Sequence, residues 1–256
     1  MRRVLPPLLL FLAAVMIWEA AVRVFLVPSY IFPSFGDVAR AAWEKRAHLG
    51  SAAQKTFLSA SVAFLVSITM GTLGAVLVSM HPWVERAFTP YLLLFQAVPI
   101  LTLAPLVVIV VGPGFAAVVV VAVASSIVPV LAGGVAGLVS TPPGLLHLFR
   151  LYGASFGETL IKLKLPWALP SLFTGCKVAG GLCVVGTVIG EYMVGMGGTQ
   201  AGLGFVIVEA AARLQVPLLF AATLLASLVG AVFFMATSAL ARVLLGPWHE
   251  SEKRNA

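Results

Sequence analysis

The amino-acid sequence predicts an all-α membrane protein, a single domain over residues 1–256 with about six transmembrane helices. This prediction rests on a hydrophobic fraction of 61%, a mean hydropathy of +1.07 and a charged fraction of only 10%. A soluble domain usually devotes about a quarter of its residues to charge, so this chain has too little polar material for a water-facing surface. Lipid suits such a surface, and spanning segments in lipid are helical because unpaired backbone groups find no partner there.

Six stretches are long and apolar enough to cross the hydrocarbon layer, which takes about 20 residues. They are residues 4–27, 52–79, 88–111, 115–139, 171–194 and 217–244. The first stretch follows Arg2 and Arg3, as the apolar part of a signal peptide would. It has no small-residue cleavage site and continues through Trp18, so we interpret it as a retained first span.

The segments between the spans differ in character. Residues 28–50 begin with prolines and continue as an amphipathic run, which predicts a short helix at the membrane interface. Residues 112–114, Gly-Pro-Gly, predict a tight turn between two spans. Residues 195–204 are rich in glycine and predict a flexible loop, not a phosphate cradle, because no Gly-Lys-Ser/Thr follows them. A short amphipathic piece comes next, around Glu209 and Arg213.

The positive charges indicate the orientation, because cytoplasmic loops are enriched in Lys and Arg. With six spans both termini share a side, and the cations on that side are Arg2, Arg3, Arg86, Arg150, Lys162, Lys164, Arg242, Lys253 and Arg254. The smaller set on the opposite side is Arg23, Arg40, Lys45, Arg46, Lys55 and Arg213. The sequence therefore predicts cytoplasmic N and C termini. The cations are scattered between apolar runs, which argues against nucleic-acid binding despite a net charge of +7.

Residues 143–170 contain the longest polar interruption of the apolar chain, at about residues 147–170. Their first ten residues can form a helix, and Gly153 permits the turn that ends it. Ser155 is a suitable N-cap for a second helix, and Glu158, three residues later, completes a capping box. Pro166 is predicted to end this second helix, because a residue before proline is pushed out of the α region. A short helix of this kind, lying outside the membrane, suits docking to a soluble partner.

The same segment resembles a known family. The pattern of Gly153, Ala154 and Ser155, an apolar-rich helix, and then Leu165, Pro166 and Pro170 is similar to the coupling segment of bacterial ABC-importer permeases. Similar residues of the nitrate/sulfonate/taurine branch fall, in order, at Trp18-Glu19, Pro28, Pro33-Ser34, Val98-Pro99, Ala104-Pro105-Leu106, Gly112, Pro129, Gly190-Glu191 and Gly202-Leu203-Gly204. The resemblance thus covers nearly the whole chain.

The resemblance implies a type I ABC importer permease fold, in which residues 143–170 occupy a groove of an ATPase subunit. The coupling residues would be Gly153, Ala154, Ser155, Glu158, Leu165 and Pro166. One departure stands out, because the acidic residue and two alanines that usually open the motif fall at His147, Leu148 and Phe149. Either this part of the contact differs from that of the relatives, or the ATPase is matched to it.

The resemblance also implies a function and its partners. The chain would be a transmembrane permease subunit in a bacterial cytoplasmic (inner) membrane, moving a small solute delivered by a periplasmic or lipoprotein binding protein. Two ATPase subunits would bind ATP, and a second copy of the permease would complete the pathway. This chain itself is expected to hold no cofactor and no metal and to be no enzyme. Its four histidines, His48, His81, His147 and His249, are single and far apart, unlike metal ligands.

Five polar residues within the predicted spans are candidates for the substrate pathway: Gln96, Ser125, Ser126, Thr187 and Glu191. A charged group within a span usually faces a cavity or a partner. Glu191 either lines or gates the pathway near the outer end of its span, or ties down the following loop by hydrogen bonds. The hydroxyls equally suit substrate contact or hydrogen bonds to backbone and neighbouring helices.

The sequence argues against two other functions. A secondary transporter would have internal repeats and a midplane ion site, and the sequence shows neither a repeat nor enough carboxylates. An intramembrane enzyme would need a catalytic pair, and Glu191 has no evident partner in the sequence. The sequence does not choose between nitrate, a sulfonate, a pyrimidine precursor of thiamine, riboflavin or another small solute. A homodimer and a heterodimer remain equally open.

Overall fold

The computed structural model describes residues 5–195 and 201–245, which form helices and short connections without any strand. The elements are α1 (Leu5–Val24), α2 (Phe35–Glu44), α3 (Arg46–Ser79), α4 (Pro82–Ala97), α5 (Ile100–Val111), α6 (Phe115–Val139), α7 (Pro143–Leu151), α8 (Phe156–Thr159), the π-helical turn η1 (Leu160–Lys164), α9 (Leu165–Val194), α10 (Leu203–Ala212) and α11 (Val216–Leu245). The all-α prediction is confirmed. Residues 196–200, the centre of the loop predicted to be flexible, lie outside the described residues, as do Arg2, Arg3 and the tail after residue 245.

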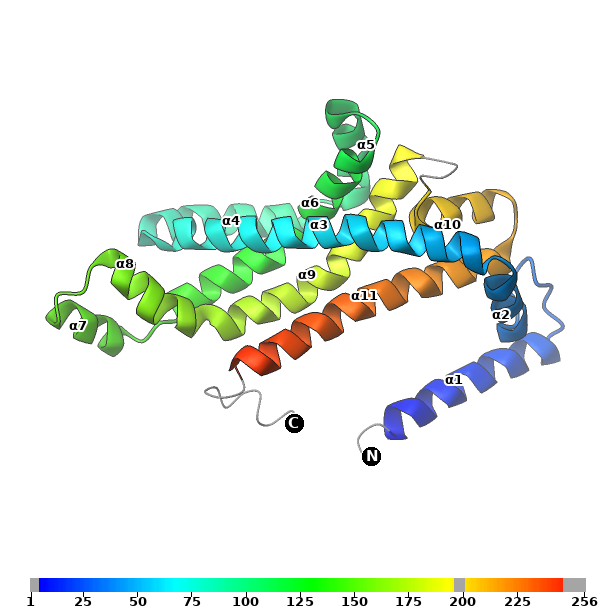
Figure 1. Ribbon diagram of the computed structural model, residues 1–256, viewed down its shortest axis with the longest axis horizontal. Helices are drawn as coiled ribbons and strands as arrows, with labels where there is room; N and C mark the ends of the chain where they lie inside the picture. The colour runs from blue at the N-terminus through cyan, green and yellow to red at the C-terminus, as the bar shows by residue number, and fades with distance from the viewer. Residues whose placement is uncertain (1–4, 196–200, 246–256) are drawn as a thin grey trace.

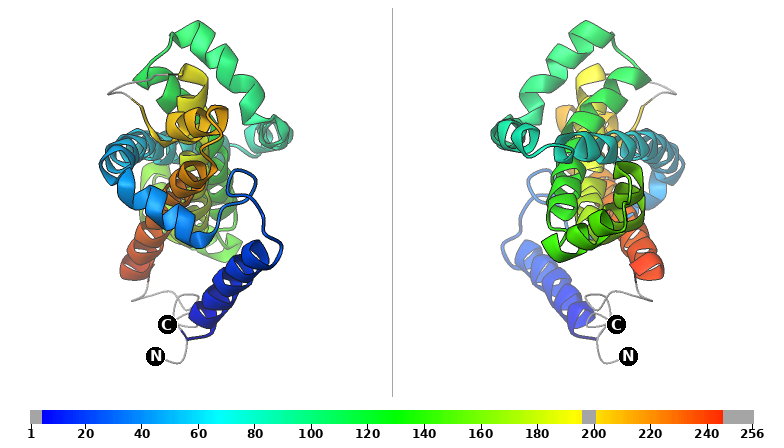
Figure 2. Two further views of the ribbon diagram at one scale, coloured as in Figure 1. Left: turned by 90° about the vertical axis from the view of Figure 1, so that its right-hand side faces the viewer. Right: turned by 90° about the vertical axis from the view of Figure 1, so that its left-hand side faces the viewer.

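The long helices form an elongated bundle with two distinct ends. Figure 1 shows α3, α6, α9 and α11 running along the molecule, with α7 and α8 at one end and α2 and α10 at the other. Figure 2 shows that α5 and α1 project on opposite sides of this bundle. The two ends are thus built from short helices, and the middle from apolar ones.

Four described helices are long and apolar enough to cross a membrane: α3, α6, the continuous helix from Phe156 to Val194, and α11. The pair α4 and α5 adds a fifth if it counts as one span. The sequence predicted about six membrane spans. The difference lies in residues 4–27, which contain the 20-residue helix α1 but are not among these four or five.

The third predicted span, residues 88–111, is not one straight helix. It breaks between α4 and α5, which meet at an angle of 94°. Val98, the residue before Pro99, is extended, with φ −73° and ψ 120°. The clash between a proline ring and the preceding residue disfavours the α region, which explains the break.

The predicted helix end at Pro166 is wrong. The chain continues helically from α8 through η1 into α9, and Pro166 lies in the first turn of α9. In the π turn the Leu165 amide donates to the Leu160 carbonyl, five residues back. This wider turn sits directly before the proline, and the first turn of a helix tolerates a residue without an N–H. The segment predicted to couple is therefore mechanically continuous with a spanning helix.

Small residues allow α6 and α9 to pack at close range. A Cβ on Gly137 would lie 2.8 Å from the Ala168 Cα, and one on Gly133 would lie 2.7 Å from the Ser171 carbonyl oxygen. Such small-residue stripes let the backbones of membrane helices approach, and van der Waals contact then drives their association. The signal was present in the sequence as paired glycines four residues apart, although our sequence analysis did not use it.

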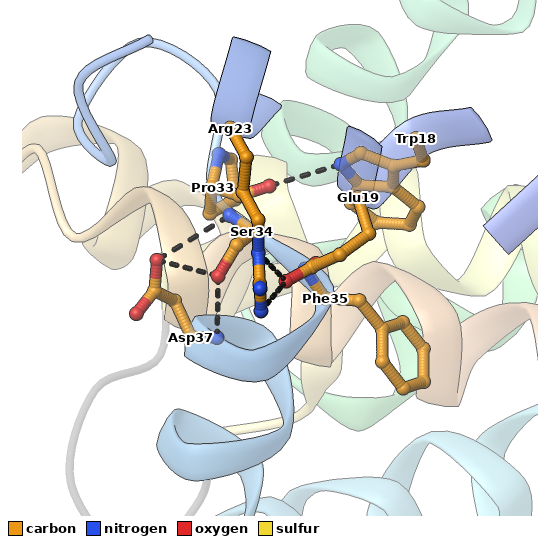
Figure 3. Close-up of polar contacts among 7 residues, drawn as sticks. All are labelled: Trp18, Glu19, Arg23, Pro33, Ser34, Phe35 and Asp37. Atoms are coloured by element: carbon orange, nitrogen blue, oxygen red, sulfur yellow. Dashed lines mark hydrogen bonds and ion pairs between the residues drawn. The ribbon is translucent and has the colours of Figure 1, made fainter. Parts of the chain in front are cut away.

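The predicted interfacial helix is α2, and it begins with a capping box. The Ser34 hydroxyl accepts from the Asp37 amide at 3.0 Å, and the Asp37 carboxylate accepts from the Ser34 amide at 3.3 Å (Figure 3). Each terminal amide thereby gains a partner that the helix itself cannot supply.

Helix α1 is attached to the rest of the molecule through contacts of Trp18 and Glu19, which also explain several residues of the family resemblance. The Trp18 Nε1 donates to the Pro33 carbonyl oxygen at 3.0 Å (Figure 3). The indole also packs against Phe220 of α11, with ring centroids 5.8 Å apart. Glu19 accepts from the Phe35 amide at 2.9 Å, at the start of α2. Trp18 and Glu19 thus pin α1 to Pro33 and to the first residue of α2, whereas Ser34 caps α2.

We expect Trp18→Leu to loosen α1 from the bundle. The change removes one hydrogen bond and the ring contacts, which together stabilise the attachment by about 2 kcal/mol. Limited proteolysis in detergent should then cleave faster between residues 25 and 33. Trp43→Leu is the matched control because Trp43 is 71% exposed. Equal cleavage of the two variants would contradict the pinning role.

Candidate functional site

The turn between α7 and α8 has the geometry predicted from the sequence. Gly153 has φ +68°, a left-handed conformation that favours glycine. Ser155 caps α8, accepting from the Glu158 amide at 3.3 Å, and the Glu158 carboxylate accepts from the Ser155 amide at 3.0 Å. The predicted capping box is confirmed.

The Glu158 carboxylate is held in its charged form. At about 1.5 Å per residue, the 39-residue helix from Phe156 to Val194 is much longer than the hydrocarbon layer is thick, and its polar first turns lie outside the layer. The hydrogen bond from the Ser155 backbone, with the bonds from Lys162 and the Ser155 hydroxyl, lowers the pKa of Glu158 to about 2. Lys162 also forms an ion pair with it at 2.9 Å. Glu158 therefore stays ionised over the physiological pH range.

The α7–α8 end presents apolar side chains to solvent. Leu151 and Tyr152 are 82% and 83% exposed. Beside them is a cleft of about 310 Å³, lined by Leu148, Phe149, Tyr152, Gly153, Ala154, Glu158 and Lys162. An exposed apolar patch rimmed by charged groups outside the spans is typical of a protein-docking surface.

The six predicted coupling residues separate into two groups. Gly153, Ala154 and Glu158 line this cleft, and Ser155 caps the helix at its edge. Leu165 instead packs against the cluster of buried residues that includes Ala75 and Leu138, and Pro166 lies beside it in the first turn of α9. The first group faces outward and the second connects the segment to the bundle.

Glu191 of α9 holds the beginning of α10. Its carboxylate accepts from the Gly204 amide at 2.8 Å and from the Thr56 hydroxyl of α3 at 2.9 Å. The Thr56 hydroxyl oxygen in turn accepts from the Leu203 amide at 2.9 Å. The first amides of a helix have no partner within it, and the N-cap Gly202 has no side chain to offer. Two residues from other helices therefore cap α10.

Gly202 makes this arrangement possible. A Cβ there would overlap the Glu191 carboxylate, so only glycine fits at this close approach. Glu191 is 8% exposed and borders a cleft of about 270 Å³ that Lys55 also lines. The hydrogen-bonding interpretation of Glu191 agrees with this geometry, and a role in the pathway stays a prediction.

The other four pathway candidates do not share one site. Gln96 and Ser125 line a cleft of about 550 Å³ bounded by α4, α5, α6 and α9. The Ser126 hydroxyl is buried and bonds the Ser67 hydroxyl of α3 at 2.8 Å. Thr187 is buried and donates to the Cys183 carbonyl at 2.9 Å. Ser126 and Thr187 are thus buried between the helices, whereas Gln96 and Ser125 line the cleft.

Thr56 is the main site residue that the sequence analysis missed. It is one of many hydroxyls in the apolar stretches, and its partner lies 135 residues further along the chain. No local pattern marks such a pair. Among the described residues there is no cluster of three or more His, Cys, Asp or Glu that could hold a metal ion.

Comparison with known proteins identifies the chain. The model of a family described as "Binding-protein-dependent transport system inner membrane component" matches residues 66–245. The chain belongs to this family. It is accordingly an ABC importer permease subunit, a multi-pass protein of the inner membrane.

Similar permeases cover nearly the whole chain. A probable ABC transporter permease protein of Haemophilus influenzae is 34% identical over 87% of this chain and 89% of its own length. The formylaminopyrimidine transport permease protein ThiX of Halalkalibacterium halodurans is 31% identical over 97% of both chains. The riboflavin transport system permease protein RibX of Chloroflexus aurantiacus is 29% identical over 89% of this chain and 84% of its own length.

The fold is shared with a solved importer. A chain of the MetNI methionine ABC transporter, in an inward-facing conformation, superposes with a TM-score of 0.58 at 19% identity. The match covers 83% of this chain and 98% of that chain. The type I importer permease fold predicted from the sequence is confirmed.

Proposed function

We propose that this permease works with two copies of a separate ABC ATPase that bind at residues 143–170, with an external solute-binding protein and with a second copy of this chain. ATP is bound and hydrolysed on the ATPase, and this chain supplies the pathway for a small solute. The end of the molecule that carries α7 and α8 is the cytoplasmic end, and both termini lie on that side.

The observation that carries this proposal is the exposed α7–α8 end, which continues without interruption into α9. Leu151, Tyr152 and the adjoining cleft offer an apolar contact with a charged rim to a soluble partner. Because η1 joins α8 to α9 as one helix, a displacement of α8 by the ATPase moves a spanning helix directly. The capping box and the left-handed Gly153 hold α8 in a fixed direction for this transfer.

The coupling motif of this chain does not open with the acidic residue and two alanines that are usual in the family, and this difference agrees with an apolar docking surface. His147, Leu148 and Phe149 stand in their place, and Leu148 and Phe149 line the cleft. These side chains make this part of the surface more apolar than an acidic residue with two alanines would. We infer that the groove of the cognate ATPase is correspondingly apolar.

We expect Leu151→Asp to prevent the ATPase from binding. The leucine is 82% exposed, so the change costs the permease fold little and places a charge in the centre of the apolar contact. The measurement is co-purification of the coexpressed ATPase with the tagged permease in mild detergent, with an expected loss of tenfold or more.

Leu214→Asp is the matched control. This leucine is 70% exposed and lies between α10 and α11, at the opposite end of the bundle. It should leave ATPase binding unchanged. Equal retention of the ATPase by the two variants would exclude residues 143–170 as the docking site.

A further inference from the structure

We propose that the cleft bounded by α4, α5, α6 and α9 is a solute site on the transport pathway, and that it takes an uncharged nitrogen heterocycle. This inference rests on the proposed function and narrows its solute to one chemical class. The cleft has a volume of about 550 Å³. Pockets that hold small organic ligands usually measure about 300–1,000 Å³.

The lengths of the helices place the cleft near the middle of the spans. Ser125 is about 15 Å along α6 from Phe115, roughly half the thickness of the hydrocarbon layer. Val178 and Leu182, from the middle of α9, form another part of the wall. The opposite wall contains the break between α4 and α5. Broken helices at this depth occur where they line a cavity or a solute site.

The cleft contains one polar side chain, Gln96, that has no hydrogen-bond partner among the described residues. A primary amide is costly at membrane depth unless it meets water, a ligand or another polar group. The Gln96 amide therefore indicates that the cleft holds polar contents, not acyl chains alone.

Ser125 supplies acceptors on the facing wall. Its hydroxyl donates to the Val121 carbonyl at 3.1 Å, which leaves the lone pairs of the oxygen available. Pro129, four residues further on, has no N–H, so the Ser125 carbonyl has no helical donor either. At the break, α5 begins after Pro99 without a side-chain cap, so its first amides add donors near Ile100.

The charge of the cleft wall that this chain supplies disfavours a strongly ionic solute. None of the described residues that line it is an Asp, Glu, Lys or Arg. A sulfonate or nitrate at membrane depth would need a cationic partner, because a helix end supplies only about half a charge. The remaining walls are apolar, with Phe95, Val185 and Leu182 among them. A flat ring with a donor and an acceptor on its edge matches the Gln96 amide, the Ser125 oxygens and these apolar walls.

The test measures direct binding to the purified permease in lipid nanodiscs. Cytosine and riboflavin are the uncharged probes, and taurine and ethanesulfonate are the charged ones, each followed by equilibrium dialysis of the radiolabelled compound. We expect at least one heterocycle to bind saturably, with a dissociation constant at least tenfold lower than that of either sulfonate. Equal or tighter binding of a sulfonate, or no saturable binding of either heterocycle, overturns the proposal.

Single substitutions test whether the heterocycle binds in this cleft. Gln96→Leu should weaken heterocycle binding about tenfold, and Ser125→Ala should weaken it less, because its carbonyl remains. Thr223→Ala is the matched control, since that hydroxyl is exposed on α11, lies outside the cleft and donates to the Leu219 carbonyl. Unchanged binding by Gln96→Leu would show that the heterocycle binds elsewhere and would overturn the proposal.

Water access separates a solute site from a surface covered by lipid or by a second copy. Gln96→Cys should react with a water-soluble maleimide in membranes, whereas the natural cysteines, Cys176 and Cys183, are buried and give a low background. A Gln96→Cys variant that does not react would overturn the proposal.

ATPase retention is measured in the same preparations. Loss of the ATPase from the wild type would refute the proposed function, whereas failed heterocycle binding with the ATPase retained refutes only the solute site.

Discussion

Gly175→Leu is expected to prevent the bundle from folding. A Cβ at this position would meet the Pro129 carbonyl oxygen well inside van der Waals distance and would also crowd the Val130 Cα at 3.2 Å. Both neighbours are backbone atoms of α6, so relief requires α6 and α9 to separate. Overpacking that cannot be relieved by side chains costs about 3 kcal/mol or more.

The same substitution on the same helix provides the control. Nothing lies within 4 Å of a Cβ built on Gly181, so Gly181→Leu should leave the bundle intact. Both variants can be melted in detergent with a thiol-reactive dye, because the two native cysteines are buried and react only on unfolding. Gly175→Leu should show reactive thiols at the lowest temperature, and Gly181→Leu should melt like the wild type. Superimposable melting curves would show that α6 and α9 do not pack as described.

Local features of the chain were predictable because the residues that make them are neighbours in sequence. The turn at Gly153 and the capping box of Ser155 and Glu158 involve six residues in all, and their residue types determine the conformation. The hydropathy of the long stretches likewise predicted most of the spans, because lipid requires apolar side chains over a fixed length.

The effect of each proline was not predictable in the same way. Pro99 breaks a helix, whereas Pro105, Pro129 and Pro170 remain inside helices and Pro166 follows a π turn. A proline in a spanning helix is tolerated where neighbouring groups or water satisfy the freed carbonyls. The outcome therefore depends on tertiary surroundings that hydropathy and spacing do not describe.

Contacts between distant residues were also beyond the sequence. Ser67 bonds Ser126, and the Cys183 thiol donates to the Ala60 carbonyl at 3.0 Å. Each partner is a common small polar residue in an apolar stretch, and nothing in one stretch identifies its partner in another. The sequence analysis correctly singled out Glu191 as costly to bury, but only the packing of α3 against α9 supplies Thr56 beside it.

Glu191→Ala is the second large effect that the structure predicts. The change leaves the Gly204 amide without an acceptor in a buried position and removes the acceptor of the Thr56 hydroxyl. A buried polar group that loses its partner costs about 1–3 kcal/mol, so we expect a loss of about 2–4 kcal/mol in the free energy of unfolding. Thiol-dye melting of the purified permease measures this loss.

Two further variants separate hydrogen bonding from charge. Glu191→Gln keeps an oxygen for the Gly204 amide and an amide group that can donate to Thr56, so it should recover more than half of the lost stability. Glu209→Ala is the control carboxylate, because Glu209 is partly exposed. Among the described residues it pairs with Arg213 alone, at 2.7 Å, a contact that stabilises by about 0–1 kcal/mol. If Glu191→Gln were as destabilising as Glu191→Ala, the hydrogen bonds to Gly204 and Thr56 would not account for the stability, and the capping role of Glu191 would be contradicted.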